Sequence, residues 1–156
     1  METQSKPQIE IQAVYMDPDP QVTVLWVSRH RPLAKQIMDL KEKLGRIKVV
    51  QVSGPVPNAE YVIELARKFN AKIIVPVLPM SFIARLAELA PKHGITVLYA
   101  RMNVVAQVSS VEEAEKLVKE APDRRTMTTY SDGTIKIHEF EKFEKVLKVF
   151  ILTEPW

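Results

Sequence analysis

Five consecutive residues, Ser28-Arg29-His30-Arg31-Pro32, gather the side chains of this chain that are best suited to an anionic ligand. Two guanidinium groups can hold phosphate oxygens through paired hydrogen bonds, and an imidazole can transfer a proton near neutral pH. Pro32 suits the first position of a helix, which would place Arg31 at the N-cap. The helix dipole disfavours cations there, and a bound phosphate would reverse that balance. The cluster therefore predicts an anion site with Ser28 and His30 as candidate catalytic residues and the arginines as ligands, while side chains that only face water are the alternative.

Three further candidates follow other predicted strands. Ser81 is expected to cap a helix and to contact the ligand, and Arg101 is expected to contact the ligand from the end of a later strand. Ser53, together with Gly54, could let a base or ribose approach the backbone, and a simple turn is the favoured alternative.

Composition excludes several common kinds of site. The chain has 156 residues, no Cys and three widely spaced His, so neither a metal site nor a disulfide is expected. Its four glycines are isolated, whereas phosphate loops need clustered glycines. We therefore expect no metal and no cofactor.

Strands and helices are predicted to alternate along the first two thirds of the chain. Continuous apolar runs predict buried strands, and stripes of apolar residues at helical spacing predict helices. The predicted strands cover residues 22–27, 47–52, 72–77 and 95–100, and the predicted helices cover 32–44, 59–69, 82–92 and 111–120. This alternation predicts an α/β fold, a Rossmann-like parallel sheet of about four strands flanked by helices. With the strand order 2-1-3-4, the ligand crevice would be lined by residues 28–31 and 78–81.

The last residues differ from this core. Predicted strands over 125–130 and 134–138 flank Ser131-Asp132-Gly133, which is a hairpin signal. We therefore divide one domain into a core with an N-terminal strand, residues 1–124, and a β-ribbon extension, residues 125–156. Apolar residues of the ribbon, among them Phe140, Phe143, Phe150 and Trp156, would suit a homodimer interface, and packing onto the ribbon's own core is the alternative.

Charge and hydropathy constrain the partners and the compartment. The formal net charge is +3, with seven basic and two acidic residues between positions 28 and 48. Local positive charge favours a small anionic ligand, and we expect no duplex nucleic acid as partner. No apolar run reaches the length of a membrane span, and the start lacks the apolar core of a signal peptide. We expect a cytoplasmic protein, and the absence of Cys is also compatible with a thermophile.

Two short motifs resemble a known group of families. The segment Leu25-Trp26-Val27-Ser28-Arg29-His30, followed by Pro32 and Gln36, and the later Val75-Pro76-Val77-Leu78-Pro79-Met80-Ser81 resemble the small CRISPR-associated Rossmann-like proteins proposed as ring nucleases. The resemblance covers roughly residues 22–100. Arg31 stands between His30 and Pro32 where those families have none, and the C-terminal ribbon is not part of their pattern.

The resemblance implies a cyclic oligoadenylate bound across the two-fold axis of a homodimer. It implies a metal-independent reaction in which a ribose 2′-hydroxyl attacks the adjacent phosphodiester, aligned by Ser28, Arg29, His30 and Ser81. The first hypothesis is therefore a nucleotide-binding protein that is also a nuclease of this kind. The alternative is a non-enzymatic nucleotide-sensing or interaction module from an archaeal or mobile-element context. A third, a nucleic-acid binder using residues 29–48, lacks interleaved aromatics, and the sequence leaves open whether the protein is an enzyme.

Overall fold

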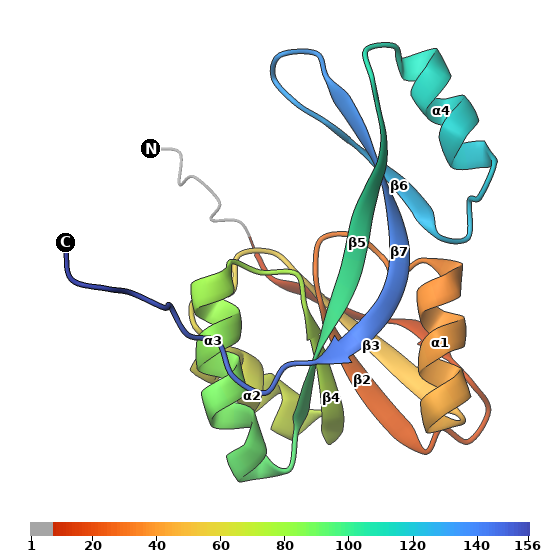
Figure 1. Ribbon diagram of the computed structural model, residues 1–156. Coiled ribbons are helices and arrows are strands. Elements are labelled where there is room, and N and C mark those ends of the chain that lie inside the picture. Colours follow the sequence, from red (N-terminus) through yellow and green to blue (C-terminus); the bar gives the residue numbers. More distant parts are fainter. Residues whose placement is uncertain (1–7) are drawn as a thin grey trace, which may run out of the picture. The chain divides into compact units, whose positions relative to one another are not determined.

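The computed structural model describes residues 8–156, so the expectation about a signal peptide at the start of the chain lies largely outside the described residues. Figure 1 shows the elements. The strands are β1 (Glu10–Met16), β2 (Val22–Val27), β3 (Ile47–Ser53), β4 (Ala71–Pro76), β5 (Thr96–Val108), β6 (Arg125–Thr129) and β7 (Ile135–Lys145). The helices are α1 (Ala34–Leu44), α2 (Ala59–Lys68), α3 (Met80–Leu89), a short 3-10 helix (Ala90–His93) and α4 (Val111–Lys119).

The predicted fold class, a Rossmann-like parallel sheet of about four strands with an appended ribbon, is wrong. Hydrogen bonds join seven strands in the order β1-β3-β2-β4-β5-β7-β6, and the sheet is mixed. β3, β2, β4 and β5 pair in parallel, in the relative order considered for these four segments. β1 pairs antiparallel with β3, and β6 antiparallel with β7.

Two local features explain the difference. Asp17 fastens the end of β1 to the start of β3, because its carboxylate accepts a hydrogen bond from the Ile47 N–H at 3.0 Å and its own N–H donates to the Ile47 carbonyl at 2.9 Å. β5 runs for 13 residues rather than ending near residue 100, since polar Arg101, Asn103 and Gln107 alternate with less exposed residues in the period of two that a half-exposed strand requires.

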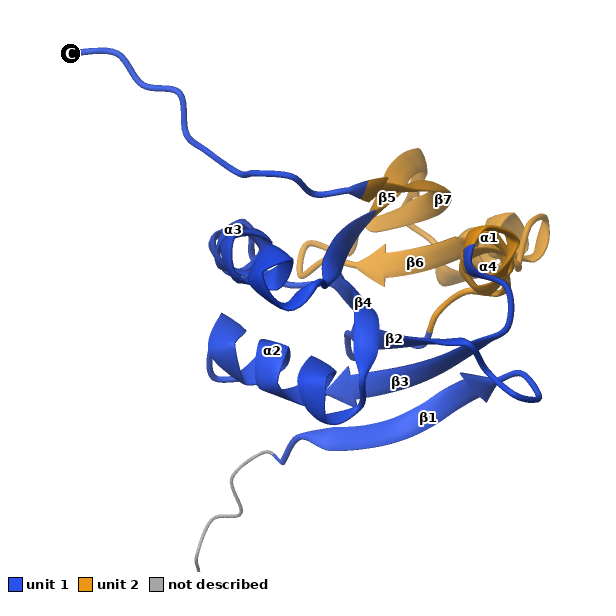
Figure 2. Cartoon of the chain, turned by 90° about the horizontal axis from the view of Figure 1, so that it is seen from below, with its two compact units in different colours: residues 1–31, 44–99, 145–156 blue, residues 32–43, 100–144 orange. Residues whose placement is uncertain are grey.

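The chain forms two compact units that interleave in sequence (Figure 2). Of the described residues, unit 1 contains 8–31, 44–99 and 145–156, and unit 2 contains 32–43 and 100–144.

Unit 1 is organised around the parallel strands and two helices. Leu25, Val50 and Ile74 of the strands are buried together with Val62 of α2 and Leu86 of α3. α2 begins as predicted, because the Asn58 side chain accepts a hydrogen bond from the Tyr61 N–H at 2.8 Å.

The predicted start of α3 is wrong. Its N-cap is Pro79, whose carbonyl accepts hydrogen bonds from the Phe82 and Ile83 N–H groups at 3.0 and 3.1 Å. Ser81 therefore lies inside the first turn, and no side-chain hydrogen bond caps the helix.

Unit 2 contains the predicted hairpin and α4. β6 and β7 flank a turn in which the Asp132 carboxylate accepts from the Thr134 N–H at 2.9 Å and Gly133 has a positive φ of 88°. Ala114 of α4 is buried with Ile135 and Ile137 of β7. β7 is a single strand of 11 residues, and the residues after it have no regular secondary structure.

α1, also in unit 2, begins later than predicted. It starts at Ala34, because the Gln36 side-chain oxygen accepts from the Leu33 N–H at 2.7 Å and makes Leu33 the cap. The expectation that Arg31 stands at the N-cap is therefore wrong.

Within residues 8–156, no helix is long and apolar enough to cross a membrane.

Candidate functional site

The candidate site is a concave pocket of about 170 Å³ in unit 1. Three segments line it: the start of β1, the residues that follow β2, and the end of β3. The lining residues are Glu10, Gln12, Arg29, Arg31, Gln51 and Ser53.

Strand register explains why these segments meet. In the antiparallel pairing of β1 with β3, Glu10 lies opposite Ser53 and Gln12 opposite Gln51. Side chains two apart on a strand share a face, so these four polar groups lie on one side of the sheet. The parallel pairing of β2 with β3 ends near the same level, and the residues after Val27 emerge beside the end of β3.

The residues that carry the two arginines, residues 28–31, are called the arginine loop here. The Ser28 N–H donates to the Val52 carbonyl at 3.1 Å, and the Ser28 carbonyl accepts from the Gln51 side-chain amide at 2.9 Å. The Ser28 hydroxyl accepts from the His30 N–H at 3.1 Å, and the Trp26 indole donates to the His30 carbonyl at 2.9 Å. Ser28, Gln51 and Trp26 are themselves buried. The start of the loop is thus fixed by the strands below it, while Arg29 and Arg31 remain exposed.

Arg29 and Arg31 differ from the remaining arginines in their partners. Within the part of the chain that the structure describes, neither forms an ion pair or a side-chain hydrogen bond. Each of the others bonds a carboxylate or a backbone carbonyl: Arg46, Arg67, Arg85, Arg101, Arg124 and Arg125. Glu10 is the acidic residue of the pocket lining, so the lining carries a net positive charge.

The predicted catalytic residues lie next to this pocket without lining it. Ser28 is buried, and its hydroxyl oxygen is engaged with the His30 N–H. The His30 side chain is exposed on the arginine loop. Their catalytic roles stay predictions.

Ser81 and Arg101 are not brought to the pocket. Ser81 is exposed on α3 and is absent from the pocket lining. Arg101 belongs to unit 2, where its guanidinium pairs with Glu144 and lies 4.0 Å from Glu141. The pocket adjoins β3 rather than the loop at residues 78–81 that was expected to line the crevice.

Three lining residues were not predicted: Glu10, Gln12 and Gln51. Gln51 could have been found, because it stands among the apolar residues Val49, Val50 and Val52 and a buried amide in such a strand needs a hydrogen-bond partner. Glu10 and Gln12 required the antiparallel pairing of the N-terminal strand with β3, which the assumption of a parallel sheet left out.

No group of three or more His, Cys, Asp or Glu residues that could hold a metal ion occurs between residues 8 and 156. What the pocket can do chemically is to bind an anion through two guanidinium groups, with amide and hydroxyl groups beside it.

No family model, no curated protein and no solved structure matches the chain. The resemblance to the families proposed as ring nucleases therefore stays a prediction that rests on its two short motifs.

Proposed function

We propose that the protein binds a small nucleotide through its phosphate in the pocket of Arg29 and Arg31. The observation that carries this proposal is the pair of guanidinium groups in one concave pocket with no ion-pair partner among residues 8–156. The other arginines of this chain each bond a carboxylate or, for Arg46, a backbone carbonyl. Two unpaired guanidinium groups on a fixed loop can hold phosphate oxygens bidentately.

The rest of the lining supports a nucleotide over an inorganic ion. Glu10 can accept hydrogen bonds from ribose hydroxyls, and the amides of Gln12 and Gln51 offer both donors and acceptors. A cyclic oligoadenylate, the ligand class implied by the resemblance, combines these features with a repeated phosphate. We propose that the protein meets such a ligand in the cytoplasm.

Binding is the primary proposal, and cleavage is a second candidate. An exposed imidazole, His30, lies on the arginine loop, one residue from each arginine, and could exchange a proton with a bound ribose phosphate. Arg29 and Arg31 would stabilise the negative charge that develops on the phosphoryl oxygens while a 2′-hydroxyl attacks the phosphorus and the bond to the 5′-oxygen breaks. A sensing module would use the same contacts without turnover.

The chain carries a built-in reporter for this test. It has two tryptophans, and Trp26 bonds the loop that carries the arginines. In a Trp156→Phe background, cyclic oligoadenylates, AMP and inorganic phosphate would be titrated against Trp26 fluorescence. The products would be separated by chromatography, with and without chelator.

We expect a saturable change with the nucleotides that is lost in Arg29→Gln/Arg31→Gln. Arg67→Gln is the matched control, since it removes an exposed arginine of the same unit whose partner is Glu64. Equal binding by the double variant would refute the site. Binding without products would reject cleavage and leave the sensing function.

A further inference from the structure

The last ten residues form an apolar segment that the chain itself does not bury. Residues 147–156, called the tail here, continue from β7 without regular secondary structure. Ile151 and Leu152 are 86% and 91% exposed, and Trp156 is fully exposed. Val146, just before the tail, is still tied to unit 1 by a hydrogen bond of 2.9 Å from its N–H to the Val97 carbonyl.

The tail has the sequence of a buried strand. Residues 149–152 are four consecutive apolar residues, Val-Phe-Ile-Leu, and such a run would present apolar side chains on both faces of a strand. β-Branched and aromatic residues also favour strands. An exposed apolar run of this length is a defect unless another surface covers it.

The area involved is that of a stable dimer. The exposed large apolar side chains of the tail are Leu147, Phe150, Ile151, Leu152 and Trp156. Burying them would remove roughly 700 Å² of apolar surface per chain. Two exchanged tails would therefore bury about 1,400 Å² before the receiving surfaces are counted, within the range of specific interfaces.

Two strand edges end the sheet, β1 and β6, and β1 is the better receiver. It has seven residues against five, and it carries exposed apolar Ile11 and Met16, whereas β6 consists of Arg, Met and three Thr residues. Within unit 1, β1 is also separated from β5, where the tail starts, by three intervening strands.

We infer that the tail of one copy adds as a strand to the β1 edge of a second copy, and that the two tails are exchanged in a homodimer. Backbone groups at the outer edge of β1 provide the hydrogen bonds, and the apolar side chains of the tail provide the buried area. In a dimer with two-fold symmetry, each tail makes the same contact with the β1 edge of the other copy. The inference does not depend on the ligand of the pocket.

The first test is the mass in solution, measured by sedimentation equilibrium. The wild-type chain is expected at twice 17.8 kDa, and Ile151→Lys/Leu152→Lys is expected as a folded monomer by circular dichroism. Met38→Lys, a change of an exposed apolar residue on α1, is the matched control and is expected to remain dimeric. A monomeric wild type, or a double variant that stays dimeric, would overturn the inference.

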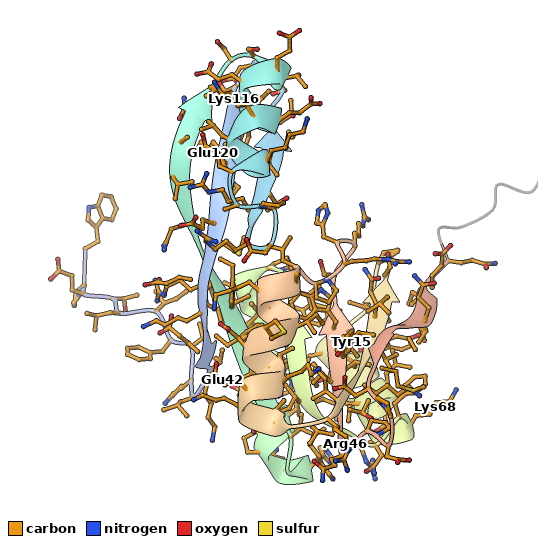
Figure 3. The ribbon with its side chains drawn as sticks, turned by 90° about the vertical axis from the view of Figure 1, so that its right-hand side faces the viewer. Tyr15, Glu42, Arg46, Lys68, Lys116 and Glu120 are labelled. Atoms are coloured by element: carbon orange, nitrogen blue, oxygen red, sulfur yellow. The ribbon has the colours of Figure 1, made fainter. Side chains whose placement is uncertain are left out.

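The second test asks whether the tail lies beside β1. Because the chain has no native Cys, only the introduced cysteines can be cross-linked. Ile151→Cys chains would be mixed with Ile11→Cys, Met16→Cys or Lys116→Cys chains and treated with a flexible bismaleimide. Cross-links to one or both β1 positions are expected, and none to Lys116, which is exposed on α4 of unit 2 (Figure 3). Cross-linking to Lys116 alone, or to none of the three, would reject β1 as the receiver. Wild-type monomers that co-sediment with phosphatidylcholine vesicles would instead identify a lipid surface as the occupant.

Discussion

The arginines of unit 2 and those of the pocket in unit 1 have opposite surroundings. In unit 2, Arg101 pairs with Glu144, and Arg124 and Arg125 share Glu139 at 3.3 and 3.0 Å. In the pocket, Arg29 and Arg31 have no such partner among the described residues. Arginine side chains thus form a network of ion pairs on the surface of unit 2, whereas the two arginines of the pocket have no such pairs among the described residues.

This difference indicates what each set of arginines does. In unit 2 the guanidinium groups hold neighbouring elements together: Arg125 also donates to the Leu117 carbonyl at 2.9 Å, which joins β6 to α4. In unit 1 the loop is held by Ser28, Gln51 and Trp26 instead. Among residues 8–156 the pocket arginines make no such structural bond, which leaves them available for the proposed binding role.

Substituting glutamine for arginines of either set gives the largest expected effects. Arg29→Gln/Arg31→Gln should weaken nucleotide binding by about 3 kcal/mol or more, roughly a hundredfold, because each charge-assisted bond contributes about 1.5–3 kcal/mol. Its unfolding midpoint in urea should be unchanged. Arg125→Gln should lower the midpoint and leave the affinity as it is, so a loss of affinity in Arg125→Gln would contradict the division of roles.

Gly54 tests whether the pocket depends on the placement of β1. Gly54 has a φ of 118°, and a Cβ there would lie 2.9 Å from the Gln8 carbonyl oxygen. Gly54→Ala should therefore cost about 1–3 kcal/mol of stability and displace the start of β1. Gly94→Ala is the control, since its φ is 67° and its Cβ would meet nothing within 4 Å. Urea unfolding should show that Gly54→Ala is less stable than Gly94→Ala. The reverse order would contradict the claim that the close contact at Gly54 holds the start of β1 in place.

Gln51 tests whether the arginine loop is held from below. Gln51→Leu leaves the Ser28 carbonyl without its side-chain donor and should cost about 1–2 kcal/mol. The affinity for nucleotide should fall as well, since the loop loses an anchor. Gln12→Leu, at an exposed position of the same pocket, should change the stability little. Calorimetric titration measures the affinity of both variants, and thermal unfolding measures their stability. Equal stability of the two would contradict a positioning role for Gln51.

The smallest expected effect is on how the free energy of unfolding falls with decreasing pH. The Arg101 guanidinium lowers the pKa of Glu144 below its ordinary value of 4.5, and the Thr134 N–H lowers the pKa of Asp132. A carboxyl group with a lowered folded pKa stabilises the fold above its unfolded pKa, and that contribution is lost as pH falls through the folded value. Stability measured in urea should decline between about pH 5 and pH 3, and less steeply in Arg101→Gln. An unchanged slope would show that this exposed pair contributes nothing.

Local features of the chain and the relative order of the four parallel strands could be predicted from the sequence, while the antiparallel pairing of β1 with β3 could not. The Asn58 cap, the turn at Asp132 and Gly133, and the strand-like character of residues 9–15 follow from residue type and spacing. The edge pairing of β1 depends on Asp17 reaching Ile47, a contact across 30 residues that no local pattern reveals.

Only part of the candidate site could be predicted from the sequence, because the rest depends on contacts between distant strands. Arg29 and Arg31 were predicted from their charges, because an anion site needs cations wherever the sheet places them. Glu10 and Gln12 depend on the register of β1 against β3, and Arg101 was misplaced because β5 continues past it into unit 2.

The guanidinium signals of the arginines test the central claim most directly. Nitrogen-detected NMR of the ¹⁵N-labelled chain resolves each arginine side chain, and substitutions assign them. On titration with a cyclic oligoadenylate, the Arg29 and Arg31 side-chain signals should shift together, and those of Arg101, Arg124 and Arg125 should stay in place. Shifts confined to the paired arginines of unit 2, or no shift at Arg29 and Arg31 at saturating ligand, would contradict the assignment of this pocket.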